Sequence, residues 1–108
     1  MQKTFIILTT AITLLTASQA QAIDARINGS NKYGCTSEEY YDKTTEMVAQ
    51  NDREAFAKIL GSGIETGICV MFKADEPVVI AKNGILMLKI RRRGDVAEYW
   101  VSSDAIVR

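Results

Sequence analysis

Apolar and polar positions along the chain change their period twice, and these changes divide it into three parts. Residues 5–15 are almost continuously apolar, interrupted only by threonines. Between Ser37 and Leu60, apolar residues recur every three or four positions, which is the period of an amphipathic helix. From Ile64 onward, short β-branched and aromatic runs alternate with turn residues, which is typical of strands. The pattern predicts an α+β protein behind an apolar leader.

The apolar leader has the features of a secretory signal peptide. Lys3 places a positive charge before the apolar run, and Ala20-x-Ala22 offers the two small side chains that a signal peptidase accepts. We therefore expect residues 1–22 to be removed by cleavage between Ala22 and Ile23. The apolar run is too short to span a bilayer. These features predict a periplasmic protein without a membrane anchor.

Two short helices are expected in the first half of the mature chain. Capping-box patterns begin at Thr36 and at Asn51, and they predict helices over residues 37–50 and 52–60. The Gly-Ser-Gly run from Gly61 is expected to end the second helix. Each helix has an apolar face, which predicts that the helices pack against a sheet. The residues of these faces are Tyr40, Tyr41, Thr44, Met47, Val48, Ala55, Phe56, Ile59 and Leu60.

The second half of the chain is expected to form an antiparallel sheet. The predicted strands cover residues 64–72, 78–81, 85–92 and 98–102, and residues 103–106 are expected to form a terminal 3₁₀ turn. Asn83-Gly84 is the strongest hairpin signal in the chain, because both positions of such a turn need a positive φ. Residues 36–108 are thus predicted as one helix-plus-sheet domain. The polar residues 23–35 before it are expected to be a flexible lead-in.

The two cysteines of the chain, Cys35 and Cys69, both lie in the predicted mature part. Export would expose them to an oxidising compartment, so we expect one structural disulfide between them. A redox-active or metal-binding pair would favour C-x-x-C spacing or nearby histidines, and the chain has neither. A bridge closing a loop of this length should stabilise the fold by about 3–4 kcal/mol.

The absence of histidine narrows the possible functions. It excludes Ser-His-Asp and Cys-His catalysis and removes the commonest metal ligand. The 13 basic and 13 acidic residues balance, which argues against binding to nucleic acid. Neither a Gly-rich phosphate loop nor calcium-loop spacing is present. We therefore expect a protein that is not an enzyme and has no cofactor or metal.

Several short motifs follow one another in the C-terminal part. They are Gly67-x-Cys69-x-x-Phe72, Pro77-Val78-Val79-Ile80, Leu88-Lys89-Ile90-Arg91, Gly94, Tyr99-Trp100-Val101 and Asp104-Ala105-Ile106. In this order they resemble small exported bacterial proteins with an SH3-like barrel. The resemblance implies two short N-terminal helices that are disulfide-linked to a small antiparallel SH3-like β-barrel. It implies no particular function, because such barrels bind peptides, cell-wall fragments and partner proteins alike.

A basic strand face is the best candidate for a partner-binding surface. Alternate residues of a strand share a face, so the predicted strand 85–92 and the turn after it should present together Lys89, Arg91, Arg93, Ile85 and Met87. A solvated hairpin face is the simpler interpretation, with its charges offset by Asp95 and Glu98.

One aromatic side chain is also expected to be accessible. Tyr99 and Trp100 are adjacent in the predicted strand and must point to opposite faces. Tryptophan is mostly buried in folded proteins, so Trp100 is expected to close the barrel core. Tyr99 then faces outward and joins the candidate partner-binding residues. An exposed Trp100, stacking on a sugar or peptide, is the alternative.

These observations predict a non-enzymatic periplasmic binding or accessory protein that acts on an envelope protein or cell-wall component. Its small size, export signal and lack of catalytic groups also suit accessory factors of mobile elements such as plasmids, acting in conjugation or in toxicity to another bacterium. The alternative is a secreted inhibitor of an enzyme such as a lysozyme. An inhibitor would present a protruding loop with an acidic or serine residue to the cleft of that enzyme.

Overall fold

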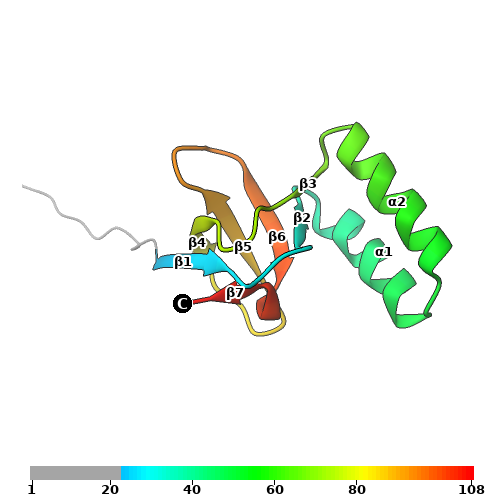
Figure 1. The fold of residues 1–108 in the computed structure, drawn as a ribbon, viewed down its shortest axis with the longest axis horizontal. Helices are drawn as coiled ribbons and strands as arrows, with labels where there is room; N and C mark the ends of the chain where they lie inside the picture. Colours follow the sequence, from blue (N-terminus) through cyan, green and yellow to red (C-terminus); the bar gives the residue numbers. More distant parts are fainter. Residues whose placement is uncertain (1–22) are drawn as a thin grey trace, which may run out of the picture.

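The computed structural model describes residues 23–108, so the predicted signal peptide, including Ala22, lies outside the described residues. The described chain forms an α+β domain with one antiparallel sheet and two helices, which lie side by side at one end of the sheet (Figure 1). Its elements are β1 (Ile23–Ile27), β2 (Tyr33–Cys35), α1 (Glu38–Ala49), α2 (Arg53–Glu65), β3 (Cys69–Met71), β4 (Pro77–Lys82), β5 (Met87–Arg92), β6 (Glu98–Ser102), the 3₁₀ helix η1 (Ser103–Ala105) and β7 (Ile106–Val107).

The sheet is open, which corrects the expectation of a closed SH3-like barrel. Its seven strands follow the order β3-β2-β6-β5-β4-β1-β7, and the edge strands β3 and β7 are not paired with each other. Closing a sheet into a barrel requires tilted strands whose two edges pair with a fixed stagger. Here the edge strands have only three and two residues, and β3 lies at the helical end of the sheet (Figure 1).

The expectation of a flexible lead-in over residues 23–35 is wrong, because this segment supplies β1 and β2. In β1, Ala25 and Ile27 are buried while Asp24 and Arg26 are exposed, so the strand has the alternation of a half-buried sheet. Because β1 and β2 precede the helices, the helices are not N-terminal to the sheet as expected. They form a helical insertion between β2 and β3.

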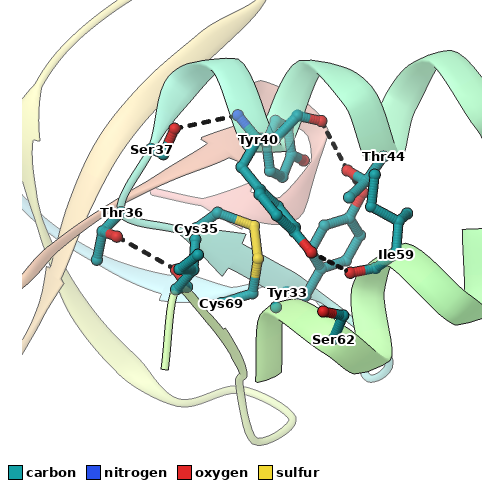
Figure 2. Close-up of a disulfide and its surroundings, with 12 residues drawn as sticks. Tyr33, Cys35, Thr36, Ser37, Tyr40, Thr44, Ile59, Ser62 and Cys69 are labelled. Carbon is teal, nitrogen blue, oxygen red and sulfur yellow. Dashed lines mark hydrogen bonds between the residues drawn. A yellow bond between two sulfur atoms is a disulfide. The ribbon is translucent and has the colours of Figure 1, made fainter. Parts of the chain in front are cut away.

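The predicted disulfide is confirmed, and it joins the two strands, β2 and β3, between which the helical insertion lies. Cys35 and Cys69 face each other in the paired strands β2 and β3, with their Cα atoms 4.0 Å apart. Both residues are fully buried. Figure 2 shows the sulfur bridge lying between α1 and α2, next to the ring of Tyr40. One bond therefore joins the two strands at the point where the chain leaves the sheet and returns to it.

Both helices begin with a capped turn, one residue later along the chain than the patterns predicted. The Ser37 hydroxyl accepts from the Tyr40 amide at the start of α1, and the Asp52 carboxylate accepts from the Ala55 amide at the start of α2. Such contacts satisfy amides that have no partner within the helix. Thr36 instead donates its hydroxyl to the carbonyl of Ile68.

Gly63 lies inside α2, which corrects the expectation that the Gly-Ser-Gly run ends the helix. A Cβ atom at Gly63 would lie 2.7 Å from the sulfur of Cys69 and 2.8 Å from the ring of Tyr40. This glycine is therefore required for close packing on the disulfide. The helix runs on to Glu65 with Thr66 as its C-cap, and Gly67 follows with a φ of 82°, the conformation that commonly terminates a helix. The strand expected over residues 64–72 is accordingly reduced to β3.

The β4–β5 connection is a four-residue loop, residues 83–86, rather than the tight turn predicted from Asn83-Gly84. Neither of these two residues has a positive φ. A Cβ atom at Gly84 would collide with the carbonyl oxygen of Met87, so the glycine permits a close approach of the backbone. The turn at residues 93–95, the strand at 98–102 and the 3₁₀ turn are as predicted.

Hydrophobic residues pack on both faces of the sheet. The inner face holds the larger core, whose members include Ile27, Val78, Leu88, Ile90 and Val101. The outer face near the helices holds a smaller cluster of the disulfide and Tyr41, with Tyr33, Tyr40, Leu60, Ile68, Met87 and Trp100 packed around them. This second cluster is the contact between the helices and the sheet.

Tyrosine hydroxyls supply polar links in the helical cluster. Tyr40 donates to the carbonyl of Ile59 at 2.6 Å and so joins α1 to α2 (Figure 2). The hydroxyls of Tyr33 and Thr44 are hydrogen-bonded at 2.5 Å. Tyr41 reaches the sheet itself, because the amide of Ser102 donates to its hydroxyl at 2.8 Å. This last bond fixes α1 over the end of β6.

Glycine substitutions in α2 should separate close packing from helix propensity. We predict that Gly63→Ala lowers the free energy of unfolding by about 1–3 kcal/mol, because the added methyl group is forced against Cys69 and Tyr40. Gly61 lies two residues earlier in open space. Gly61→Ala should therefore raise stability by about 0.5–1 kcal/mol, since alanine is the better helix former. Urea unfolding of the two oxidised variants tests this, and equal effects would contradict the packing described.

Alkaline pH should destabilise the domain through Tyr41. Burial, and then the neighbouring Tyr33, raise the pKa of Tyr41 above its usual value of 10.0. Above about pH 10 the unfolded chain therefore loses this proton while the folded chain retains it, which favours unfolding. The contribution of the protonated Tyr41 to the free energy of unfolding is therefore fully present below about pH 10 and is lost as the pH rises above it.

Urea unfolding between about pH 8 and pH 11 measures this effect. The free energy of unfolding should fall more steeply above pH 10 in the parent protein than in Tyr41→Phe. Burial also raises the pKa of Tyr33, so a smaller fall should persist in the variant. An identical fall in both proteins would contradict the assignment to Tyr41.

Candidate functional site

The outer face of the sheet carries a row of side chains that crosses four strands. Residues paired across neighbouring strands share a face, and the register aligns Lys82, Lys89, Trp100 and Cys35 on β4, β5, β6 and β2. The ammonium groups of Lys89 and Lys82 lie 5.1 and 5.8 Å from the centre of the Trp100 ring. Both distances are in the range of cation–π attraction.

The roles expected for Tyr99 and Trp100 are reversed. Tyr99 is only 7% exposed and packs in the inner core, with its ring edge-on to Phe72. It therefore does not belong to an accessible partner-binding surface. Trp100 is half-buried on the outer face, beside the helical cluster. The alternation of β6 carries the signal for this: Val101 shares a face with Tyr99, whereas Trp100 lies between the polar residues Glu98 and Ser102.

The predicted basic residues do lie on the outer face, but each has a partner within the domain. Lys89 and Arg91 alternate with the buried Leu88 and Ile90, as expected. The ammonium of Lys89 lies 3.5 Å from Glu98. Arg91 donates to the carbonyl of Asp95 at 3.1 Å.

Arg93 follows the end of β5 and forms an ion pair with Asp24 of β1. The charges of Lys89 and Arg93 are therefore paired with carboxylates, and the guanidinium of Arg91 is hydrogen-bonded to a backbone carbonyl. This arrangement agrees with the simpler interpretation of a solvated face more closely than with an uncompensated basic patch.

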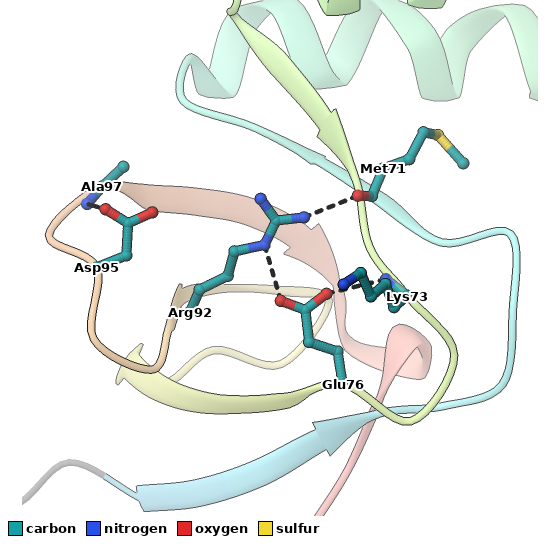
Figure 3. A network of polar contacts seen from close by, with 6 residues as sticks. All are labelled: Met71, Lys73, Glu76, Arg92, Asp95 and Ala97. Atoms are coloured by element: carbon teal, nitrogen blue, oxygen red, sulfur yellow. Dashed lines mark hydrogen bonds and ion pairs between the residues drawn. The ribbon is translucent and has the colours of Figure 1, made fainter.

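Arg92, on the opposite side from these residues, has a structural role. Its guanidinium donates to the Glu76 carboxylate and to the Met71 carbonyl, both at 2.8 Å (Figure 3). The same carboxylate accepts from the Lys73 amide at 2.9 Å. Arg92 also lies over the ring of Phe72. This network fixes the segment between β3 and β4 to β5.

Ile85 and Met87 are separated by the structure, although they were expected to share a strand face. Met87 is half-buried and packs against the helical cluster. Ile85 lies in the loop before β5 and is 90% exposed. Its neighbour Leu86, which the sequence analysis did not single out, is 80% exposed. The amide of Ser103 donates to the carbonyl of Leu86 at 2.9 Å, so the backbone of this apolar tip is held against η1.

A groove lies between α1 and this apolar tip. It has a volume of about 540 Å³ and is lined by Glu38, Tyr41, Asp42, Thr45, Leu86, Met87 and Ser102. The hydrogen bond from Ser102 to Tyr41 crosses its floor. The sequence pattern had no local signal for this groove, because it forms only when α1 docks across the end of β6.

The described part of the chain holds no group of three or more acidic, cysteine or histidine side chains placed to bind a metal ion. Within residues 23–108, no helix combines the length and the apolar character needed to cross a membrane. A disulfide of this kind is typical of proteins that fold in an oxidising compartment.

Comparison with models of known protein families, with characterised proteins and with solved structures found no match. The likeness to SH3-like barrels therefore rests on the sequence motifs and on the presence of a small antiparallel sheet domain.

Substitution of two adjacent arginines should distinguish structural from surface roles. Arg92→Met removes two hydrogen bonds made by a charged group, and we predict a loss of about 2–3 kcal/mol in unfolding free energy. Arg93→Met removes one exposed ion pair and should cost no more than about 0.5–1 kcal/mol. Denaturant unfolding of both variants measures the difference. A larger loss for Arg93→Met would contradict the network in Figure 3.

Proposed function

We propose that this protein is a non-enzymatic binding or accessory protein of the periplasm, which acts by direct contact with an envelope partner. The observation that carries the proposal is the apolar tip of the β4–β5 loop. Ile85 and Leu86 are adjacent, large and almost fully exposed, and the Leu86 backbone is held by the Ser103 amide. Contiguous apolar side chains held at a protruding position are typical of surfaces that a partner covers.

The surroundings of the tip suit a protein or peptide partner. The two strands that the loop joins carry Lys82 and Lys89, which lie over the ring of Trp100 and offer two cations beside an aromatic ring. Leu86 itself lines the groove beside α1. Interfaces of this kind combine an apolar centre with a polar rim. The contact surface that we propose is therefore centred on Leu86, with the basic residues at its rim.

An enzyme inhibitor is the alternative, and Asp75 before β4 and Ser30 between β1 and β2 are exposed loop residues of the type that it would use. In the loop after β5, the carboxylate of Asp95 accepts hydrogen bonds from the amides of Val96 and Ala97. That carboxylate is used to shape its own turn. The loop with the apolar tip, residues 83–86, has neither an acidic residue nor a serine. The exposed apolar tip favours the accessory protein, and action for a mobile element such as a plasmid is part of this proposal.

Site-specific photo-crosslinking in the envelope of the producing cell tests the proposed contact. A photoreactive residue at position 86 should give a discrete adduct with one envelope component. Position 96 is the matched control, because Val96 is 89% exposed on the other hairpin loop and should give none. Ile85→Ser should weaken the adduct at position 86 without destabilising the fold, because exposed positions tolerate such changes within about 0.5 kcal/mol. Equal labelling from both positions, or from neither, would contradict the proposal.

A further inference from the structure

The groove between α1 and the β4–β5 loop has two chemically different walls. Glu38 and Asp42 lie four residues apart on α1 and so on one face of the helix. Neither carboxylate forms an ion pair with another residue of the described part of the chain. The opposite wall is apolar and consists of Leu86 and Met87.

The floor and the apolar wall of the groove are held in position before any partner arrives. Tyr41 is buried, and its hydroxyl accepts from the Ser102 amide, which fixes α1 at the end of β6. The next amide, that of Ser103, donates to the carbonyl of Leu86 and fixes the loop. Two consecutive amides of one short segment therefore set the separation of the two walls. A groove organised in this way binds with a smaller entropy cost than one that forms on binding.

The negative charges of Glu38 and Asp42 on the α1 wall determine which kind of ligand the groove can bind. Like charges four residues apart on a helix repel each other, and a cation placed between them would relieve that repulsion. An acidic segment or an anionic lipid surface would be repelled by the same pair. On the other wall, covering Leu86 is most favourable when the covering group is an apolar side chain. The occupant must therefore present cations on one side and apolar groups on the other.

An extended peptide meets this requirement, because successive side chains of a strand point to opposite sides. We infer that the groove binds an extended segment of a partner protein in which basic and apolar residues alternate. The basic side chains lie against Glu38 and Asp42, and the apolar ones pack on Leu86 and Met87. This inference rests on the proposed function, and it adds the chemistry of the partner and the place where it binds.

Short synthetic peptides provide the probe. The hexapeptide acetyl-Leu-Lys-Leu-Lys-Leu-Lys-amide should bind the oxidised protein in isothermal titration calorimetry, and its glutamate analogue acetyl-Leu-Glu-Leu-Glu-Leu-Glu-amide should not. The affinity should fall as salt is raised, because exposed charges are screened. Backbone NMR shifts should change around α1 and residues 86–87.

Two charge-reversal variants of α1 test the site. Glu38→Lys/Asp42→Lys should lower the affinity for the lysine peptide about tenfold or more, which is the loss of one modest charge interaction. Glu39→Lys/Glu46→Lys makes the same change in net charge on the same helix, at exposed positions outside the groove. This control should keep most of the affinity. Leu86→Ser should also weaken binding, but without changing its dependence on salt.

The outcomes separate this inference from the proposed function. Failure of the lysine peptide to bind, equal loss in both charge-reversal variants, or equal binding of the glutamate peptide would overturn the groove assignment. A crosslinked partner at position 86 would still support the proposed function in that case. Conversely, peptide binding without any envelope adduct would leave the groove assignment standing and contradict the proposed function.

Discussion

The helical layer of this protein depends on one pair of facing residues, Cys35 and Cys69, where the chain leaves the sheet and returns to it. α2 packs so closely on the disulfide that only glycine fits at position 63 without displacing its neighbours. It also anchors the small outer cluster, in which Tyr41 and Trp100 meet. The disulfide thus holds the helical layer on the sheet, and the hydrogen bond from Ser102 to Tyr41 then sets the position of α1 over β6 beside the groove.

The sequence predicts elements whose signals are local. The strand at residues 98–102 alternates clearly, and the two cysteines have no competing partner, so both expectations were correct. Non-local effects account for the errors. Residues 23–27 form a strand because β4 and β7 pair with them, and their polar composition conceals this. Gly63 stays helical because its neighbours in space, not in sequence, require a small residue there.

The candidate site shows the same division between local and non-local information. The alternation of Lys89 and Arg91 with Leu88 and Ile90 could be read from the sequence. The ion pairs of Lys89 and Arg93 could not, because their partners come from β6 and β1. The exposed tip at Leu86 depends on the actual length of the loop, which exceeds the turn that Asn83-Gly84 predicts. The groove needs α1, β6 and the loop together. The proposed contact is centred on Leu86, which lines this groove together with Met87.

Hydrogen exchange in a disulfide-free variant tests this dependence most directly. In Cys35→Ala/Cys69→Ala, the amides of α1, α2 and β3 should lose protection, because the remaining residues of the small outer cluster and the Tyr41 hydrogen bond then hold the helices to the sheet without a covalent link. The amides of β4, β5 and β6 should retain most of theirs, since the inner core is unchanged. Equal loss of protection in the helices and in the central strands, or no loss in the helices, would contradict the account.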